Sequence, residues 1–337
     1  MNETIKVVAY EQHGNPPDVL RIKTEPWPKP AAGEVVVQMR AAPINPADIN
    51  AIEGKYPGRR EVPNVPGFEG SGIVVEIGDN VSTISKGALV ILPHNIGTWR
   101  EAVAVKASDL IEVPSEIDPV HAATLKINPL TAWRLLHGYV DLNRGDWVIQ
   151  NAANSAAGRA VIQIAHELGF KTVNIVRRAE LIEELRAEGG DVVLVDGESP
   201  SRSGTLRDEV KASTNGAAIR LGLNSVGGDS ALRVANCLAF GGTLVSFGAM
   251  SLQPLKIPTG LFIFKDLRFR GIWINHWYDN ATMSERMAAF NPLFEMAKRG
   301  LVRTPVEKSY AIDEARAAVA HAMQNKRRGK IVFQFAA

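Results

Sequence analysis

The stretch WVIQNAANSAAGRAVIQIAHEL, residues 147–168, decides the fold of this chain. It begins as a short apolar strand, continues through the small and polar residues 151–157, and becomes helical in periodicity from Gly158. Small residues let backbone N–H groups approach a pyrophosphate, and the N-terminus of a helix attracts its negative charge. The stretch therefore predicts a dinucleotide-binding loop. Only Gly158 remains of the usual glycine-rich fingerprint, and such a turn also occurs simply for packing.

Strands and helices alternate from this stretch to about residue 300. We expect strands at 146–150, 171–176, 191–195, 217–224, 242–247 and 267–274, and helices at 131–139, 158–168, 180–188, 230–238 and 284–298. Alternation of this kind produces right-handed crossovers and a parallel sheet with helices on both faces.

The chain before residue 123 has a different pattern. Short strands are expected at 5–9, 34–41, 72–77, 88–92 and 99–105, separated by turn signals. The end of the chain, with a strand at 330–335, has the same character. We therefore expect an α/β protein in which a doubly wound, Rossmann-type parallel-sheet domain, residues 123–299, is inserted into a mainly β barrel formed by residues 1–122 and 300–337.

The bulk composition indicates a folded chain with two domains, because 337 residues exceed one ordinary core. The 38 basic and 36 acidic residues give a formal charge of +2, so we expect neither nucleic acid nor membrane as a partner. Cys237 is the only cysteine, which excludes an internal disulfide and a metal site of several thiolates. With no signal-peptide pattern and no long apolar run, we expect a cytoplasmic protein.

The two residues after the second strand of the alternating region indicate the cofactor. In NAD-binding proteins of this fold, an acid near that point binds the ribose 2′-hydroxyl. Here the residues are Arg177 and Arg178, whose guanidinium groups match the charge and geometry of a 2′-phosphate. We therefore expect NADPH. The alternative is that both arginines only solvate the end of the strand.

A series of motifs along nearly the whole chain resembles one family. The motifs are INPADIN (44–50), GKY (54–56), GFEG (67–70), AATL (122–125), INPLTA (127–132), QNA (150–152), FKDL (264–267) and RGIW (270–273). They are similar to those of the zinc-independent medium-chain dehydrogenase/reductase superfamily, above all the trans-2-enoyl-CoA (enoyl-thioester) reductases, with quinone oxidoreductases as near relatives. The resemblance implies a GroES-like barrel domain and an NADPH-dependent oxidoreductase of fatty acid metabolism, acting on the C=C bond of 2-enoyl thioesters of coenzyme A or acyl-carrier protein.

The zinc-dependent members of this superfamily carry a cysteine within the segment 44–48 and a histidine where Phe68 stands. Both ligands are absent from this sequence, so we expect no metal and no zinc-polarised carbonyl or alcohol. Glu69 remains, and one acid without thiolate or imidazole neighbours is expected to be a buried hydrogen-bond acceptor.

Tyr56 is the catalytic residue that the resemblance implies. Reduction of a conjugated C=C bond without metal needs a hydride donor, a group that stabilises charge on the carbonyl oxygen, and a proton source. A phenol can hydrogen-bond the developing enolate or deliver a proton to the α-carbon. Without the resemblance, an aromatic residue that only covers the end of the barrel is the simpler interpretation. Lys55, Arg59 and Arg60 are candidates for binding the phosphates of coenzyme A.

The resemblance also implies a set of cofactor contacts. Besides Arg177 and Arg178, these are Asn128 near the nicotinamide, Asn154, Ser155, Ala156 and Ala157 along the pyrophosphate, Phe247, Gly248, Ala249 and Met250 over the cofactor, Ile272, Trp273 and Ile274 between cofactor and substrate, and Lys330 late in the chain. Lys126 departs from the family pattern, which usually has a small residue there. The residues alone would assign 247–250 to the core and Lys330 to the surface.

Two alternatives share parts of this prediction. A zinc-free NADPH:quinone or enone oxidoreductase has the same fold and cofactor but needs no acyl channel. A non-catalytic NADPH-binding protein has the fold without turnover, because fold does not fix function. The family resemblance further implies a homodimer in which edge strands near Leu267–Ile274 pair.

Overall fold

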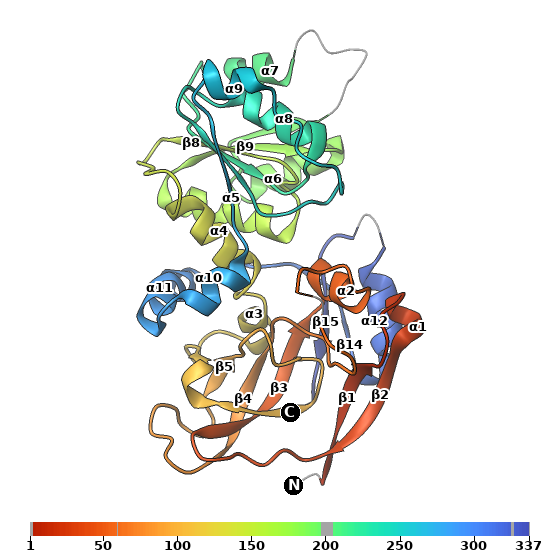
Figure 1. Ribbon diagram of the computed structural model, residues 1–337. Coiled ribbons are helices and arrows are strands. Elements are labelled where there is room, and N and C mark those ends of the chain that lie inside the picture. Colours follow the sequence, from red (N-terminus) through yellow and green to blue (C-terminus); the bar gives the residue numbers. More distant parts are fainter. Residues whose placement is uncertain (1–2, 59, 197–204, 325–326, 337) are drawn as a thin grey trace. The chain divides into compact units, whose positions relative to one another are not determined.

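The computed structural model describes residues 3–58, 60–196, 205–324 and 327–336, and its chain separates into two compact units (Figure 1). The inserted unit comprises residues 128–289, and the split unit comprises residues 1–127 and 290–337. The expected boundaries were 122/123 and 299/300. The observed boundaries lie at 127/128 and 289/290. The second observed boundary falls inside one continuous helix, α11 (Met283–Lys298), which the sequence pattern assigned whole to the inserted domain.

The split unit is mainly β. Its elements are β1 (Thr4–Tyr10), α1 (Pro16–Val19), β2 (Leu20–Pro26), β3 (Glu34–Pro43), α2 (Pro46–Ile52), β4 (Ser71–Ile77), β5 (Leu89–Ile91), β6 (Ala102–Lys106), the 3₁₀ turn Ala107–Asp109, β7 (Ile111–Glu112), α3 (Pro119–Ala123), β14 (Val306–Tyr310), the 3₁₀ turn Ile312–Glu314, α12 (Ala315–Ala322) and β15 (Lys330–Gln334).

Strands from both ends of the chain share one sheet in the split unit. The sheet order is β14-β15-β3-β4-β5-β7, with β6 also paired to β3, while β1 and β2 form a separate antiparallel pair. The alternation of buried residues along β3 places Val35 and Val37 in one apolar cluster and Val36 in another. The ring of Trp99 meets Phe333 edge-on at 5.1 Å, so the last strand completes the core of this unit.

The inserted unit alternates helix and strand. Its elements are α4 (Asn128–His137), β8 (Trp147–Gln150), α5 (Ala156–Leu168), β9 (Lys171–Val176), the 3₁₀ turn Ala179–Leu181, α6 (Ile182–Ala187), β10 (Val192–Val195), α7 (Leu206–Ser213), β11 (Leu221–Asn224), α8 (Gly228–Cys237), β12 (Thr243–Ser246), α9 (Thr259–Ile263), β13 (Arg268–Gly271), α10 (Ile274–Asn280) and the start of α11.

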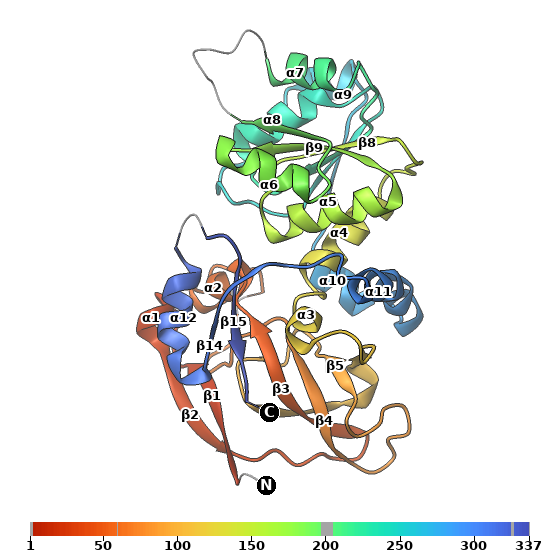
Figure 2. The same cartoon turned by 180° about the vertical axis from the view of Figure 1, so that it is seen from behind.

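The sheet of the inserted unit is parallel throughout, in the order β10-β9-β8-β11-β12-β13. The chain order reverses between β8 and β11, which is the crevice where doubly wound sheets bind ligands. Helices α4 to α6 cover one face and α7 to α9 the other (Figures 1 and 2). Apolar clusters fill both sides of the sheet, and the expected α/β class with a doubly wound sheet is confirmed.

Several expected elements differ from the structure. The strand predicted at 267–274 is wrong at its end: β13 stops at Gly271, and Ile274 begins helix α10. The β-branched and aromatic residues 272–274 favour a strand locally, but the chain leaves the sheet edge there. Helices α1, α2, α3, α7, α9, α10 and α12 and strands β2, β7 and β14 were not predicted. Residues 197–204 of the polar stretch before α7 lie outside the described residues.

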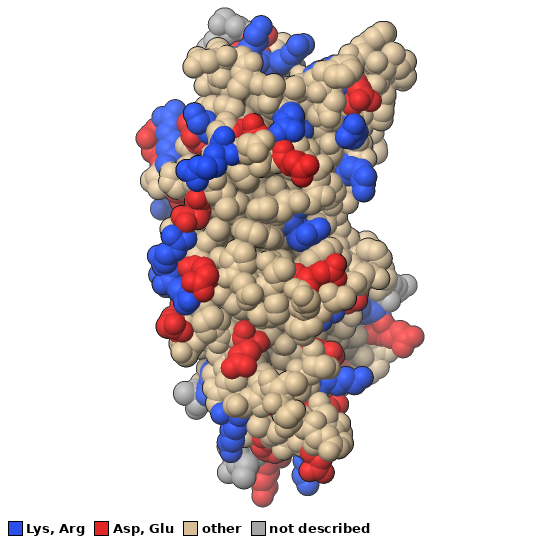
Figure 3. Space-filling model, turned by 90° about the vertical axis from the view of Figure 1, so that its left-hand side faces the viewer, with Lys and Arg blue, Asp and Glu red and all other residues tan. Residues whose placement is uncertain are grey.

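On the face drawn in Figure 3, basic and acidic side chains are interspersed, as the near-balanced composition suggests. No helix formed by the described residues is long and apolar enough to cross a membrane.

Candidate functional site

The conformation of the loop after β8 is fixed by hydrogen bonds among its own residues. Ala152 has a φ of +49°, and the Ser155 N–H donates to the Ala152 carbonyl at 2.9 Å. The Ser155 hydroxyl then caps α5 by accepting the Gly158 N–H at 3.1 Å. A Cβ on Gly158 would lie 2.5 Å from the Ala153 carbonyl oxygen, so only glycine fits there. Because the first N–H groups of a helix lack partners within it, the N–H groups of residues 156 and 157 are suited to bind an anion.

A buried amide network holds this loop against the neighbouring strands. The Asn151 amide donates to the Asn224 side chain at 2.9 Å and to the Ser230 hydroxyl at 3.2 Å, and its oxygen accepts the Ser225 N–H at 2.8 Å. The network therefore fixes the carboxyl ends of β8 and β11 on either side of the crevice. Asn224 was not among the predicted site residues, although a polar residue at the carboxyl end of a buried strand is a signal that could have identified it.

The two predicted phosphate-binding arginines follow β9 directly. Arg177 is exposed, and the Arg178 guanidinium lies 3.1 Å from the Glu180 carboxylate. The acid at the end of the adjacent strand, Asp196, already accepts hydrogen bonds from Nε and one terminal nitrogen of the Arg233 guanidinium, at 2.6 and 2.9 Å. Its charge is thereby offset, so the end of β9 can accept an additional anion.

The other predicted residues of the inserted unit also lie at carboxyl ends of strands. Residues 247–250 follow β12, and the Phe247 N–H donates to the Asn224 carbonyl at 2.9 Å. Residues 272–274 follow β13, with the Trp273 side chain 47% exposed. The structure therefore brings the predicted loop, the arginines and these two segments to one edge of the sheet, where open α/β sheets bind ligands.

Asn128 begins α4, and its position provides a test of cofactor fit. Its side-chain nitrogen is buried, and it has no hydrogen-bond partner among the described residues. A buried donor without a partner is costly, and a ligand amide or carbonyl would satisfy it. Together with the α5 N-terminus and the two arginines, this donor fits a phosphorylated dinucleotide.

In the split unit, Tyr56 lies in a short loop after α2. The N–H groups of Lys55 and Tyr56 both donate to the Asn50 carbonyl, at 2.8 and 3.1 Å, which fixes the start of the loop. The Tyr56 ring packs against Phe68 at 5.1 Å, and the Arg60 guanidinium lies 4.8 Å above the Phe68 ring. Arg59 lies outside the described residues.

The backbone of Phe68 is held at both ends by buried ionisable side chains. Its N–H donates to Asp48 at 2.9 Å, and its carbonyl accepts from the Lys126 ammonium at 3.2 Å. Lys126, only 2% exposed, also donates to the Leu92 carbonyl at 2.8 Å. Lys126, which departs from the family pattern, therefore links the Phe68 and Leu92 backbones next to the Tyr56 loop.

Two acids and two lysines form one buried cluster in this unit. Glu69 accepts the Asn45 amide at 2.8 Å and the Ile127 N–H at 3.0 Å, and the Lys330 ammonium donates to the Asn45 side-chain oxygen. Lys330 is thus buried and belongs to this cluster, not to the surface. Sequence could not reveal the contact, because 285 residues separate Asn45 from Lys330.

Burial dominates the protonation of this cluster. It raises the pKa of Asp48 to about 7, against the opposing effect of the Asn45 and Phe68 N–H groups. Burial also raises the pKa of Glu69, which Lys330 opposes, and lowers the pKa of Lys330. Glu69 is therefore the buried acceptor expected from the sequence. Among the described residues no group of three or more His, Cys, Asp or Glu is arranged to hold a metal.

Two family models match the chain. The alcohol dehydrogenase GroES-like domain matches residues 31–115, and the zinc-binding dehydrogenase model matches residues 156–289. These matches support the predicted GroES-like and Rossmann-type domains.

Relatives match almost the whole chain. The mitochondrial enoyl-[acyl-carrier-protein] reductase of Caenorhabditis elegans is 41% identical over 91% of this chain and 91% of its own length. The human enzyme of the same name is 37% identical over 95% of this chain and 86% of its own length. The expectation of a cytoplasmic protein was therefore wrong: these relatives are named as mitochondrial enzymes and point to a mitochondrial location.

Solved structures are similar over the same length. A mutant enoyl thioester reductase of Candida tropicalis, and a complex of Etr1p with NADP and crotonyl-CoA, each have 29% identity and a TM-score of 0.88 over 98% of this chain and 100% of the other. A mycobacterial quinone oxidoreductase has 27% identity and a TM-score of 0.86 over 98% of this chain and 99% of its own.

Proposed function

Because this chain belongs to the enoyl-[acyl-carrier-protein] reductase family of the medium-chain dehydrogenase/reductase superfamily, we propose that it reduces the C=C bond of 2-enoyl thioesters with NADPH. The observation that carries the proposal is the contact between Tyr56 and Phe68. Phe68 stands where zinc-dependent members of the superfamily carry a metal-binding histidine. In this chain Phe68 instead packs against the Tyr56 ring. We therefore assign stabilisation of the negative charge on the substrate carbonyl oxygen to the Tyr56 hydroxyl in place of a metal.

The reaction adds a hydride to the β-carbon of the enoyl group and a proton to the α-carbon. When bound, NADPH supplies the hydride. As the C=C electrons move toward the carbonyl, negative charge develops on the thioester oxygen. Either Tyr56 delivers the proton to the α-carbon and water restores the phenol, or Tyr56 hydrogen-bonds that oxygen and water supplies the proton to the α-carbon.

The residues that hold the cofactor are proposed from their positions. Residues 154–157 line the pyrophosphate, which the backbone N–H groups of residues 156 and 157 bind, and Arg177 and Arg178 bind the 2′-phosphate. Asn128 binds near the nicotinamide through its buried nitrogen. Phe247, Gly248, Ala249 and Met250, with Ile272, Trp273, Ile274 and Lys330, complete the proposed set.

The second candidate function is a quinone or enone reductase, which the similarity to the mycobacterial quinone oxidoreductase favours. A panel of crotonyl-CoA, a simple enone and a quinone, each assayed with NADPH and NADH, separates the two. We expect the highest kcat/KM with crotonyl-CoA and NADPH. A quinone reduced faster than crotonyl-CoA, or equal rates with NADH, would refute the proposal.

The same proposal includes a homodimer formed through β13. This strand lies at the edge of the sheet, and large apolar side chains are exposed close to it in sequence, with Phe264 77% exposed. Unpaired strand edges and exposed apolar patches favour association. Light scattering after size exclusion should give twice the 36.5 kDa chain mass, and a monomer at micromolar concentration would contradict this part.

A further inference from the structure

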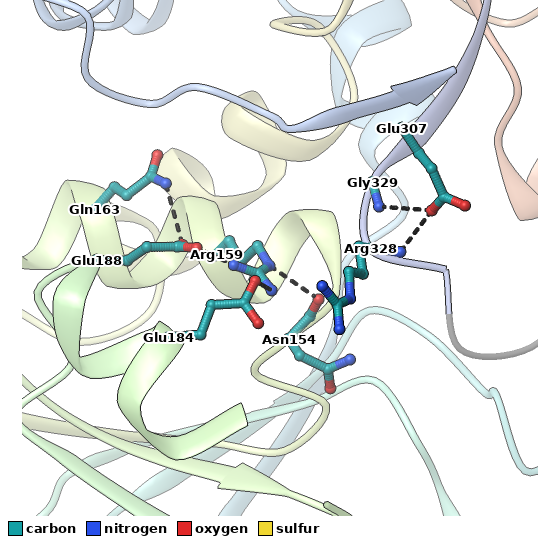
Figure 4. Close-up of polar contacts among 8 residues, drawn as sticks. All are labelled: Asn154, Arg159, Gln163, Glu184, Glu188, Glu307, Arg328 and Gly329. Carbon is teal, nitrogen blue, oxygen red and sulfur yellow. Dashed lines mark hydrogen bonds and ion pairs between the residues drawn. The ribbon is translucent and has the colours of Figure 1, made fainter. Parts of the chain in front are cut away.

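Arg159 is a buried cation in the first turn of α5, directly behind the loop that follows β8. Its side chain is 7% exposed. The guanidinium lies 2.6 Å from the Glu184 carboxylate and also contacts Glu188, both contributed by α6 and the residue after it (Figure 4). Gln163, one turn further along α5, donates to the other oxygen of Glu188 at 3.3 Å. The two carboxylates thus fix the plane of the guanidinium.

The third nitrogen of the Arg159 guanidinium, Nε, contacts the loop. It donates to the Asn154 carbonyl at 3.3 Å (Figure 4). The other end of that peptide, the Ser155 N–H, donates to the Ala152 carbonyl at 2.9 Å. Both ends of the Asn154–Ser155 peptide are therefore tied, and the peptide immediately precedes the helix N-terminus that we propose for the pyrophosphate.

Arg159 balances the negative charges of Glu184 and Glu188. One guanidinium is placed against two carboxylates, and it separates them from the loop. Without it, Glu184 and Glu188, whose side chains are 43% and 20% exposed, would place two partly solvated negative charges behind an anion-binding turn. A planar guanidinium can contact both acids and still direct Nε to a carbonyl, which the single ammonium of a lysine cannot do in the same geometry.

We propose that Arg159 is a positioning residue for the pyrophosphate of the cofactor: held by Glu184 and Glu188, it fixes the Asn154 carbonyl and so the direction of the N–H groups at the start of α5. This inference rests on the proposed nucleotide site and adds a residue that does not itself touch the ligand. Because NADPH and NADH share the pyrophosphate, Arg159 acts equally on both, unlike the arginines after β9.

The test is nucleotide binding by the apoprotein, measured by calorimetry with NADPH and NADH for the wild type, Arg159→Met, Arg159→Lys and the control Arg186→Met. Arg186 lies exposed on α6 and pairs with Glu183 at 2.9 Å, so its loss removes a charge without touching the loop. We expect Arg159→Met to raise the Kd of both nucleotides by about tenfold or more. Arg159→Lys should raise them nearly as much, and Arg186→Met should leave them within about twofold.

Each outcome has one meaning. Values of Kd for Arg159→Met within twofold of the wild type, full affinity in Arg159→Lys, or loss of NADPH affinity alone would overturn the role of Arg159. If Arg159→Met does not fold, as judged by circular dichroism, the lysine variant decides. A wild-type protein that binds neither nucleotide would instead refute the proposed function. At saturating nucleotide, kcat of the folded variants should match the wild type, and a fall in kcat without a change in Kd would also overturn the inference.

Discussion

The ring of Tyr56 rests on the ring of Phe68, with centroids 5.1 Å apart and planes tilted by 45°. Tilted aromatic pairs at this distance are favourable, so the contact restricts where the phenol can lie. Phe68 is itself held through its N–H by Asp48 and through its carbonyl by Lys126. The proposed catalytic group is therefore supported by a buried network of ionisable side chains in the same unit.

Replacing Tyr56 with phenylalanine removes the hydroxyl and keeps the ring contact with Phe68. We expect kcat with crotonyl-CoA to fall by about 100-fold, the loss typical of an acid or an oxyanion donor. The Kd for NADPH and the unfolding midpoint should stay unchanged. Stopped-flow measurement of NADPH oxidation checks this, and an undiminished rate would reject the role of Tyr56.

Replacing Lys126 with methionine keeps similar length and removes the ammonium. The carbonyls of Phe68 and Leu92 then lose a buried donor, so we expect the free energy of unfolding to fall by about 1–3 kcal/mol. Urea unfolding measures the change, with Lys106→Met, an exposed lysine at the end of β6, as the control. A stability equal to or above the wild type would show that the buried ammonium contributes nothing.

Replacing Arg177 and Arg178 together with alanine should change the choice of nucleotide. We expect the Kd for NADPH to rise by about 10- to 100-fold, because charge-assisted hydrogen bonds to a phosphate are lost. The Kd for NADH, which has no 2′-phosphate, should stay nearly constant and serves as the internal control. If both constants rose together, or neither did, the arginines would only solvate the end of β9.

Asp48 should make stability depend on pH. Its pKa is raised from 3.8 to about 7 in the folded protein, so between these values the folded state holds a proton that the unfolded state has lost. Stability from this group is therefore greatest at acid pH and falls, by roughly 4 kcal/mol in total, as pH rises toward 7. The free energy of unfolding of Asp48→Asn should fall furthest below that of the wild type near pH 4, and the difference should shrink toward pH 7. Urea unfolding over this range, with exposed Asp79→Asn as the control, tests it; a constant deficit would contradict the assignment.

The sequence analysis predicted the inserted unit more closely than the split unit. Strand β9 has the predicted bounds, because its apolar run ends at a charged pair. Strand β14 was missed because four of its five residues are exposed, and its partner β15 lies at the end of the chain. Helix α2 was missed because its apolar pattern is too short to show periodicity, and its start depends on the Asn45–Asp48 capping contact.

The candidate site shows the same limit. Residues at carboxyl ends of strands, such as Arg177, could be predicted because chain order alone places them there. The buried partners could not be predicted. Asn45 and Lys330 meet only after distant segments pack, and a lysine such as Lys126 is normally expected at the surface. Arg159 lies within residues 147–168, the stretch that predicts the dinucleotide-binding loop. Its proposed role could not be predicted from that stretch, because it depends on acids contributed by α6 and the residue after it.

The position of β15 between β14 and β3 constrains the order of assembly. When the chain is delivered N-terminus first, residues 34–38 of β3 can pair early with β6, but residues 41–43 wait for β15, and the whole inserted unit comes between them. The inserted unit is continuous and can fold as soon as it has emerged, whereas residues 41–43 of β3 in the split unit keep unpaired backbone groups until β15 is made. Truncation by a few residues at the C-terminus would thus damage the half of the protein that is made first.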